Sequence, residues 1–312
     1  MKIDYKRKIV EFIFTITTSL ILMFMGTYYF TGFMFLYPLP FILLGFKYDI
    51  NHALLALILS AVSTGLMLDM VSGILIFVMF APLCLSLIYT MKSRRDSLTI
   101  LCINTLIFLF SILLMINISK NMTGISIIGQ LSDISNQTIN YWIDVLKDIG
   151  SSNYEILKAR EFLEERFEYL ILTVPALTMI FSLIIAYLNF LLATLLLSRL
   201  GYGVVSIPRF SKFKLPNNFL LGTGLMFLGA FIIKKLEIFY YETIFINLTA
   251  IVSFLFLTQG LAVIDYKLKI KNVKIILRLL IYVFLILPII GIMPFIGVLD
   301  IIFDFRGLRK YS

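Results

Sequence analysis

Eight long stretches without Asp, Glu, Lys or Arg constrain this chain more than any other feature. Each has at least 19 residues, and they cover residues 12–46, 50–68, 70–91, 97–119, 169–198, 215–233, 243–264 and 279–299. A helix rises about 1.5 Å per residue and the hydrocarbon core of a bilayer is about 30 Å thick, so roughly 20 apolar residues make one crossing. Transmembrane strands would instead alternate in runs of about ten residues. The pattern therefore predicts an all-α, polytopic transmembrane helix bundle.

Composition and motifs exclude several classes of protein. Hydrophobic residues make up 60% of the chain and charged residues only 14%, whereas soluble domains carry about 25% charged residues. The sequence has no HExxH motif and no phosphate-binding loop, and its single histidine, His52, cannot form a zinc site alone. Cys84 and Cys102 lie inside apolar stretches and are predicted to be small buried side chains. We therefore expect no enzyme, no cofactor and no metal site.

Charge bias indicates eight or nine spans. The first stretch is too long for one helix and contains Gly32 and two prolines, so we divide it into helices at 12–30 and 33–46. Basic residues before residue 12 and at 92–95 predict that both flanks are cytoplasmic. An even number of crossings must separate them, so we count 33–46 as a full crossing rather than a re-entrant segment. The basic residues before the first stretch are Lys2, Lys6, Arg7 and Lys8.

The last uncharged stretch, 279–299, has two possible topologies. Proline or glycine recurs every third residue from Pro288 to Gly297, which disagrees with the helical period of 3.6 residues. The last stretch either crosses once or breaks and folds back. The basic residues Arg306, Arg309 and Lys310 favour a broken hairpin with a cytoplasmic end.

We expect one integral membrane domain over residues 1–312 in a bacterial cell membrane, with the N-terminus in the cytoplasm. Five spans are predicted in residues 12–118, an extracytoplasmic segment at 119–168 and the remaining spans in 169–312. The net charge is +9, and the predicted topology places most of the basic residues on one face of the membrane. This predicts attraction to anionic lipid headgroups and no binding of nucleic acid, which would need a folded basic domain.

The extracytoplasmic segment is patterned. Apolar residues at helical spacing predict two amphipathic helices in it, one at 139–149 that ends at Gly150 and one at 156–170 that continues into the next span. These helices either cover a site that opens outward or lie in the membrane interface, anchored by Trp142.

Asp69 is the first candidate for a ligand-binding or coupling residue. An ionised carboxylate costs about 2.5–3.5 kcal/mol at the centre of a membrane-spanning helix. In a continuous helix Asp69 would share a small-residue face with Gly65 and Gly73, where another helix could pack closely. Alternatively, it lies in the outer turn between two spans, where water removes the cost. Both alternatives place the acid toward the outer face.

Five further polar residues are candidates for the same role. Asp300 and Asp304 flank the end of the last stretch, and Arg306 is close enough to neutralise one of them, as a structural ion pair or as part of a proton relay. Gln259 and Asn189 lie well inside predicted spans. Each is expected to hydrogen-bond a neighbouring helix or a ligand.

A basic and aromatic segment precedes the sixth uncharged stretch. Its residues are Arg209, Phe210, Lys212, Phe213 and Lys214. Such a composition suits a segment at headgroup level or a docking site for a cytoplasmic or membrane protein partner.

The chain resembles the YybS-like family of uncharacterised bacterial multi-pass membrane proteins. The motifs that carry the resemblance are Arg-Phe-Ser-Lys-Phe-Lys-Leu-Pro at 209–216, Gly-Leu-Ala-Val-Ile-Asp-Tyr at 260–266 and Gly-Val-Leu-Asp-Ile-Ile-Phe-Asp-Phe-Arg at 297–306. This family is distantly similar to the substrate-binding subunits of energy-coupling-factor transporters and to the rod-shape protein MreD. The predicted span count is higher than in those subunits, and the first span lacks their alanine docking patch.

Two functions follow from the residues and the resemblance. The first is a small-solute-binding or transport-associated subunit that accepts its solute near Asp69, beneath the amphipathic helices. The second is a non-transporting scaffold whose basic cytoplasmic loops recruit envelope or division proteins. An outward-facing cavity with Asp69 or Gln259 in its wall would favour the first, and a fully packed bundle would favour the second.

Overall fold

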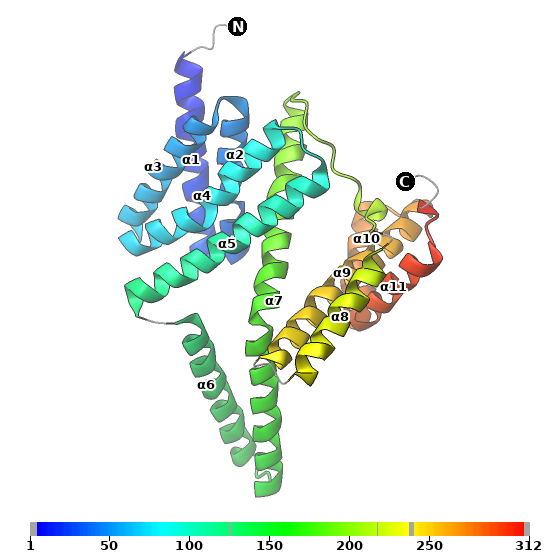
Figure 1. The fold of residues 1–312 in the computed structure, drawn as a ribbon. Coiled ribbons are helices and arrows are strands. Elements are labelled where there is room, and N and C mark those ends of the chain that lie inside the picture. The colour runs from blue at the N-terminus through cyan, green and yellow to red at the C-terminus, as the bar shows by residue number, and fades with distance from the viewer. Residues whose placement is uncertain (1–4, 125, 217, 237–239, 309–312) are drawn as a thin grey trace. The chain divides into compact units, whose positions relative to one another are not determined.

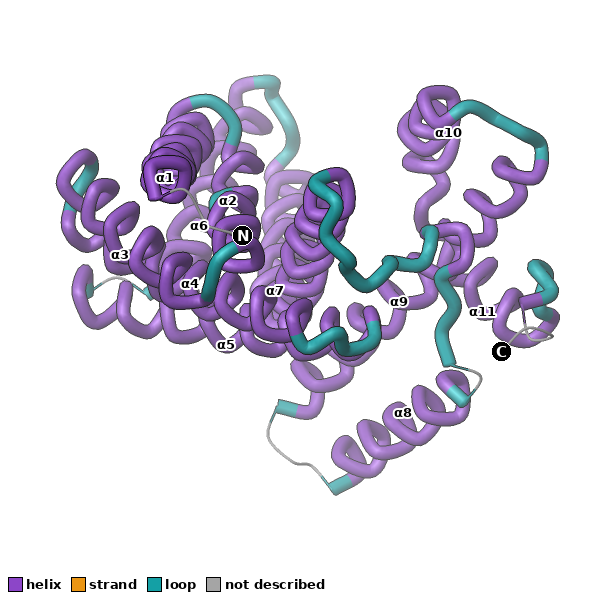
Figure 2. Tube along the Cα trace, turned by 90° about the horizontal axis from the view of Figure 1, so that it is seen from above, coloured by secondary structure: helices purple, strands orange, loops and turns teal. Residues whose placement is uncertain are grey.

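The computed structural model describes residues 5–124, 126–216, 218–236 and 240–308. Over these residues it contains eleven α-helices, short 3₁₀ and π segments, and no strand (Figure 2). The predicted all-α fold is therefore confirmed. Lys2, Arg309 and Lys310, which contribute to the predicted charge bias, lie outside the described residues.

Contacts divide the chain into two compact units. Unit 1 contains Met1–Ile171 and Phe181–Ile207, and unit 2 contains Leu172–Ile180 and Pro208–Ser312. One helix, α7 (Asn153–Arg199), contributes to both units, because its residues Leu172–Ile180 group with unit 2.

Within the described residues, six helices are long and apolar enough to cross a membrane. They are α1 (Tyr5–Tyr28), α3 (Ile50–Met67), α4 (Met70–Lys92), α5 (Ser97–Thr123), α7 (Asn153–Arg199) and α9 (Tyr241–Ile270). A bent pair, Ile275–Phe284 and Leu287–Phe303, makes a seventh if it forms one span, and the apolar segment Thr31–Lys47 is shorter. Helix α8 (Phe219–Lys235) has 17 residues. Several apolar helices of sufficient length are confirmed, whereas the count of eight or nine spans stays a prediction.

The first uncharged stretch is divided as predicted. Helix α1 ends at Tyr28, and a 3₁₀ helix, η1 (Thr31–Leu36), leads into α2 (Pro38–Lys47). Pro38 stands at the first position of α2, where its missing N–H would have no helical partner. Tyr37 and Phe41 are fully buried, so α2 forms part of the core of unit 1. Whether residues 33–46 cross the membrane stays a prediction.

Three aspartates begin consecutive helices of unit 1. Asp49, Asp69 and Asp96 are the N-caps of α3, α4 and α5, and each side chain accepts a hydrogen bond from a backbone N–H at the start of its helix. Carboxylates are among the best caps because these N–H groups have no partner inside the helix. Helices α3, α4 and α5 therefore begin at the acidic residues that bound the uncharged stretches.

The segment after α5 forms a helical hairpin. Helix α6 (Ile127–Asp148) lies beside the first part of α7 (Figure 1), and Arg160 Nη2 donates to Asn140 Oδ1 at 3.1 Å. Gly150 has a left-handed backbone with φ of 79°, so the predicted stop is confirmed. The first amphipathic helix is also confirmed. The second continues into the following apolar stretch, as predicted, because α7 extends from Asn153 to Arg199 for 47 residues.

The tight connection between α6 and α7 explains this geometry. The N–H groups of Gly150 and Ser151 donate to the carbonyls of Lys147 and Leu146, the pattern that commonly ends a helix at glycine. Ser152 and Glu155 then form a reciprocal capping box that starts α7.

The last uncharged stretch is broken. Helices α10 (Ile275–Ile281) and α11 (Met293–Phe303) are separated by π and 3₁₀ segments, η3 (Tyr282–Ile286) and η4 (Leu287–Ile292), and Ile289 leaves the helical region with φ of −111°. The two halves are bent by 74°. This agrees with the break expected from the proline and glycine repeat.

Cys84 is buried as predicted, but Cys102 is exposed on the surface of α5.

Candidate functional site

Two glycines allow α9 and α11 of unit 2 to cross with their backbones in contact. A Cβ atom on Gly260 would lie 2.1 Å from the carbonyl oxygen of Met293, and one on Gly297 would lie 2.0 Å from that of Phe256. Neither position can therefore carry a side chain without a shift of the helices. Small residues commonly permit such crossings between membrane helices. The crossing brings Gln259, next to Gly260, near Asp300, one turn after Gly297.

Asp300 forms a buried ion pair with Arg306. The side chains of Asp300 and Arg306 are 2% and 0% exposed. Arg306 Nη2 and Nε donate to Asp300 Oδ2 at 2.8 and 3.2 Å, and Gln259 Nε2 donates to the same oxygen at 2.6 Å. We call Gln259, Asp300 and Arg306 the anchor cluster. The structure thus brings together three of the residues that the sequence singles out.

The chain reaches this geometry through a left-handed turn after α11. Asp304 is the C-cap residue, with φ of 48° and ψ of 54°, and its Oδ1 accepts a hydrogen bond from Leu308 N–H. Short polar side chains tolerate this backbone conformation better than most residues. The turn sends Arg306 back along α11, so that it pairs with Asp300.

The anchor cluster holds an irregular stretch of backbone. Arg306 Nη1 donates to the carbonyl oxygens of Ser211 and Phe213 at 3.0 and 2.7 Å, and Gln259 Oε1 accepts from Leu215 N–H at 3.0 Å. Ser211 and Leu215 are 1% and 6% exposed. Irregular backbone in an apolar setting needs internal hydrogen-bond partners, because lipid offers none. The cluster supplies three of them.

The same stretch exposes its basic and aromatic side chains. We call residues 209–214 the basic segment. Arg209, Phe210 and Lys212 are exposed, whereas Phe213 and Lys214 are half-buried. A short 3₁₀ helix, η2 (Phe210–Lys212), places these side chains around a buried Ser211. The backbone is therefore fixed from the inside while the charged side chains face outward.

Asp69 lies apart from this cluster, in unit 1. It is exposed in the turn between α3 and α4, so the predicted alternative of a turn is confirmed and that of a continuous helix is wrong. Its Oδ1 accepts from Ser72 N–H at 2.8 Å, and its Oδ2 accepts from the Ser72 hydroxyl. These two hydrogen bonds lower the pKa of the Asp69 carboxyl below its ordinary value. Both oxygens are thus used to start α4.

Asn189 also lies in unit 1 and binds backbone. Its Nδ2 donates to the carbonyl oxygens of Phe35 and Ile185 at 2.8 and 3.0 Å. In a 3₁₀ helix the donor to Phe35 would be the N–H of residue 38, which is a proline and has none. Asn189 therefore connects η1 to α7, which agrees with its predicted bond to a neighbouring helix.

Asn247 plays a similar part in unit 2 and was not predicted. Its Oδ1 accepts from Ala176 N–H at 2.6 Å, and its Nδ2 donates to the carbonyl of Leu172 at 2.8 Å. These two backbone groups would bind each other in an uninterrupted helix. Pro175 lies between them in α7 and weakens the helical ladder there. A proline inside an uncharged stretch is the sequence signal that could have prompted a search for such a polar partner.

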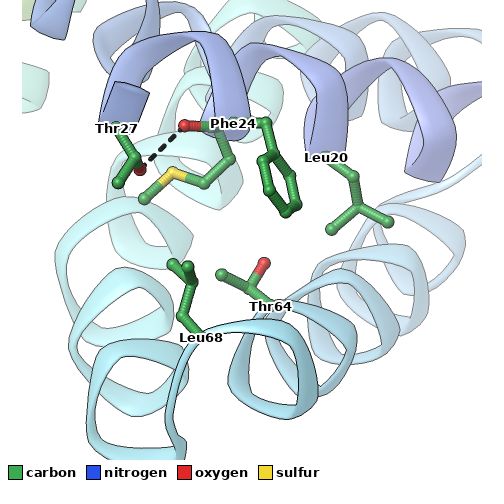
Figure 3. Close-up of a pocket in the computed structure, with 6 residues that line it drawn as sticks. Leu20, Phe24, Thr27, Thr64 and Leu68 are labelled. Carbon is green, nitrogen blue, oxygen red and sulfur yellow. Dashed lines mark hydrogen bonds between the residues drawn. The ribbon is translucent and has the colours of Figure 1, made fainter. Parts of the chain in front are cut away.

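The two described pockets lie between α1 and α3 and contain none of the predicted site residues. The first holds about 10 Å³ and is lined by Leu20, Met23, Phe24, Thr27, Thr64 and Leu68. Figure 3 shows that side chains of α1 face Thr64 and Leu68 across it, and that the Thr27 hydroxyl donates to its own helix, to Met23 O at 3.0 Å. A space of this size holds about one water molecule.

The second pocket is an open apolar groove of about 630 Å³ along α1, bounded by Met67. In a membrane such a groove would face lipid. Among the described residues, no group of three or more His, Cys, Asp or Glu side chains could hold a metal ion.

Comparison with known proteins identifies a family for the chain but no individual relative. No curated protein and no solved structure matches it, so the similarity to energy-coupling-factor subunits and to MreD stays a prediction, as does the YybS-like assignment. The profile of the family described as "Predicted membrane protein (DUF2232)" matches residues 12–301. The chain therefore belongs to this family of membrane proteins.

Proposed function

We propose that this membrane protein is a non-transporting scaffold that binds an acidic cytoplasmic protein through the basic segment. The observation that carries the proposal is the fixed backbone of this segment, which Arg306 and Gln259 hold from the buried side. Arg209, Phe210 and Lys212 then face outward, and their side chains form no hydrogen bond or ion pair with the other described residues.

Fixed presentation matters because binding orders flexible side chains and loops at a cost. Each long side chain that becomes immobile on binding costs about 0.5–1.5 kcal/mol, and an ordered backbone removes part of this cost in advance. Positive charges around one aromatic side chain also attract acidic surfaces and speed their encounter. The predicted topology, with the N-terminus in the cytoplasm of a bacterium, places the basic segment on the cytoplasmic face.

The solute-binding alternative has less support. Asp69 uses both carboxylate oxygens on Ser72, and Gln259 uses its amide on Asp300 and Leu215. Neither residue lines the two described pockets. A solute for the apolar groove along α1 would have to be lipid-like.

The test uses photo-crosslinking in living cells. A photoreactive amino acid replaces Phe210, and crosslinked products are compared between the native background and a triple variant, Arg209→Glu, Lys212→Glu and Lys214→Glu. We expect one protein adduct of defined mass in the native background and its loss in the triple variant, because the acidic partner is then repelled.

The matched control reverses three other basic residues at the predicted cytoplasmic end of α9, namely Lys267→Glu, Lys269→Glu and Lys271→Glu. The control changes the net charge equally and should keep the adduct. Retention of the adduct in the first triple variant, with normal membrane insertion, would overturn the proposal. Adducts with lipid alone would also overturn it.

A further inference from the structure

Helix α6 of unit 1 has two apolar faces, and α7 covers only one of them. The inner face consists of Ser135, Ile139 and Ile143, which are 7%, 4% and 3% exposed. The outer seam, as we call it, consists of Thr138, Tyr141, Trp142, Val145 and Ile149. In this seam Tyr141, Trp142 and Ile149 are 65%, 50% and 71% exposed, and Thr138 and Val145 are half-buried.

The spacing of the outer seam suits a helix as its partner. Thr138, Trp142, Val145 and Ile149 follow one another at intervals of four, three and four residues. This is the repeat with which coiled-coil helices pack against each other. Tyr141 widens the seam, and its ring lies 6.0 Å from that of Trp142.

The length of α7 shows that the outer seam lies outside the lipid. Charged residues occur in α7 up to Glu168, and none follows until Arg199. The uncharged part is about 45 Å long, so the hydrocarbon core of about 30 Å fits inside it. Arg160, which binds Asn140 of α6, precedes Glu168 by eight residues. It therefore lies about 12 Å farther from the uncharged part of α7 than Glu168 does.

Trp142 lies farther still from the membrane. It follows Asn140 by two residues in the direction of the turn at Gly150, which adds about 3 Å. The headgroup layer adds only about 5–8 Å to each side of the hydrocarbon core. The prediction that Trp142 anchors an interfacial helix does not fit this height. An apolar stripe in water needs another explanation, because exposed apolar surfaces of soluble segments usually mark binding sites.

Charge indicates which partner fits. Residues 127–168 carry eight acidic and four basic residues, a net charge of −4. Asp148 lies next to the outer seam at the helical spacing, and Asp144 lies one turn before it, where it forms an exposed ion pair with Lys147 at 3.0 Å. A second copy of the chain would bring like charges together, whereas a partner with Lys or Arg beside its apolar face would be attracted.

We propose that the outer seam docks an amphipathic helix of an extracytoplasmic protein, with Lys or Arg residues flanking the apolar face of that helix. The surface is independent of the basic segment, which lies in unit 2. Docking at the outer seam can therefore be tested separately from the proposed scaffold function.

The position of the seam is tested first. Trp142 is the only tryptophan in the chain, so its fluorescence reports on the seam without labelling. In vesicles of phosphatidylcholine containing the full-length protein, we expect acrylamide to quench Trp142 and quenchers attached to lipid tails or headgroups to have no effect. Efficient quenching by the lipid-attached groups would place Trp142 in the membrane and overturn the proposal.

Binding is tested with two synthetic helical peptides of 21 residues added to the protein in phosphatidylcholine nanodiscs. Both carry leucine at the seam positions of each heptad, and the flanking positions carry lysine in one and glutamate in the other. The lysine peptide should shift the Trp142 emission to shorter wavelength and bind at least about tenfold more tightly than the glutamate peptide, as expected for close charge pairs.

Two double variants complete this test. Asp144→Lys with Asp148→Lys should reverse the preference in favour of the glutamate peptide. Val145→Ser with Ile149→Ser leaves the inner face intact and should weaken both peptides about tenfold or more, because apolar contact is lost. Equal binding of the lysine peptide to all variants, or self-association of the protein through the seam without peptide, would overturn the proposal.

Discussion

Two ion pairs, one in each unit, differ in how much water they meet. In unit 1 the side chains of Lys47 and Glu11 are 28% and 27% exposed, whereas those of Arg306 and Asp300 in unit 2 are 0% and 2% exposed. Glu11 also accepts hydrogen bonds from Arg7 and Tyr48. Burial and the bond to Glu11 raise the pKa of Tyr48 to about 12, so it remains a donor at neutral pH.

The difference shows what each pair contributes. Water reaches the half-buried pair in unit 1 and can replace a lost partner, so this pair contributes about 1 kcal/mol or less. A buried pair has no such replacement, and loss of one partner leaves an unpaired charge. Arg306 also donates hydrogen bonds to two backbone carbonyls of the basic segment. The pair in unit 2 therefore determines the conformation of that segment. The pair in unit 1 only links the ends of two helices.

The largest effect is expected for Arg306→Leu. It leaves Asp300 buried without a cation, and the free energy of unfolding should fall by about 3–5 kcal/mol, measured by denaturant titration in detergent micelles. The double variant Arg306→Leu with Asp300→Leu removes both charges and should recover more than half of this loss. Equal losses in the single and double variants would show that the ion pair is not the cause.

A smaller effect is expected where the two helices of unit 2 cross. Gly260→Ala places a methyl group against the carbonyl of Met293 and should destabilise the protein by about 1–3 kcal/mol, the usual cost of overpacking. Gly222→Ala in α8 is the matched control, because no atom lies within 4 Å of its added Cβ. The control should be neutral or slightly stabilising in the same titration. Similar losses for both variants would contradict a close crossing.

The half-buried pair in unit 1 should matter less than the buried pair in unit 2. Lys47→Ala should lower the free energy of unfolding by no more than about 1 kcal/mol, because Arg7, Tyr48 and water can satisfy Glu11. The loss should shrink in high salt, which screens exposed charges. A loss as large as that of Arg306→Leu, measured under identical conditions, would remove the distinction between the two pairs.

Asp69 provides a pH test of the exposed caps in unit 1. Its carboxyl has a pKa below the ordinary value of 3.8, so its contribution to stability is complete above that pH and is lost as pH falls through the lowered value. Asp69→Ala should lower the melting temperature at pH 7, and the difference from the native protein should shrink as the pH falls below 3.8. A difference that is independent of pH would show that the charge has no part in capping α4.

The sequence predicts the helices better than it predicts the anchor cluster. Uncharged stretches bounded by Asp49, Asp69 and Asp96 correspond to helices because the bounding carboxylates are also helix caps. The pairing of Arg306 could not be decided in advance between Asp300 and Asp304. A left-handed backbone at Asp304 decides it, and no local pattern in the sequence requires that conformation.

The contacts with the basic segment were also beyond sequence reasoning. Arg306 binds carbonyls about 95 residues earlier in the chain, and backbone carbonyls carry no residue-specific signal. Gln259 was expected to bond a neighbouring helix, and its contact with Asp300 of α11 agrees with that expectation. Its contact with Leu215 N–H was not foreseen, because an irregular segment was not expected to lie beside α9.

The most direct test of the central claim is hydrogen exchange in the peptide that covers residues 209–216, measured by mass spectrometry in nanodiscs. The claim is that the buried ion pair fixes the basic segment. We predict slow exchange of the Leu215 amide in the native protein and at least about tenfold faster exchange in the double variant Arg306→Leu with Asp300→Leu, with α4 unchanged as the internal reference. Equal protection of Leu215 in both proteins would contradict the claim.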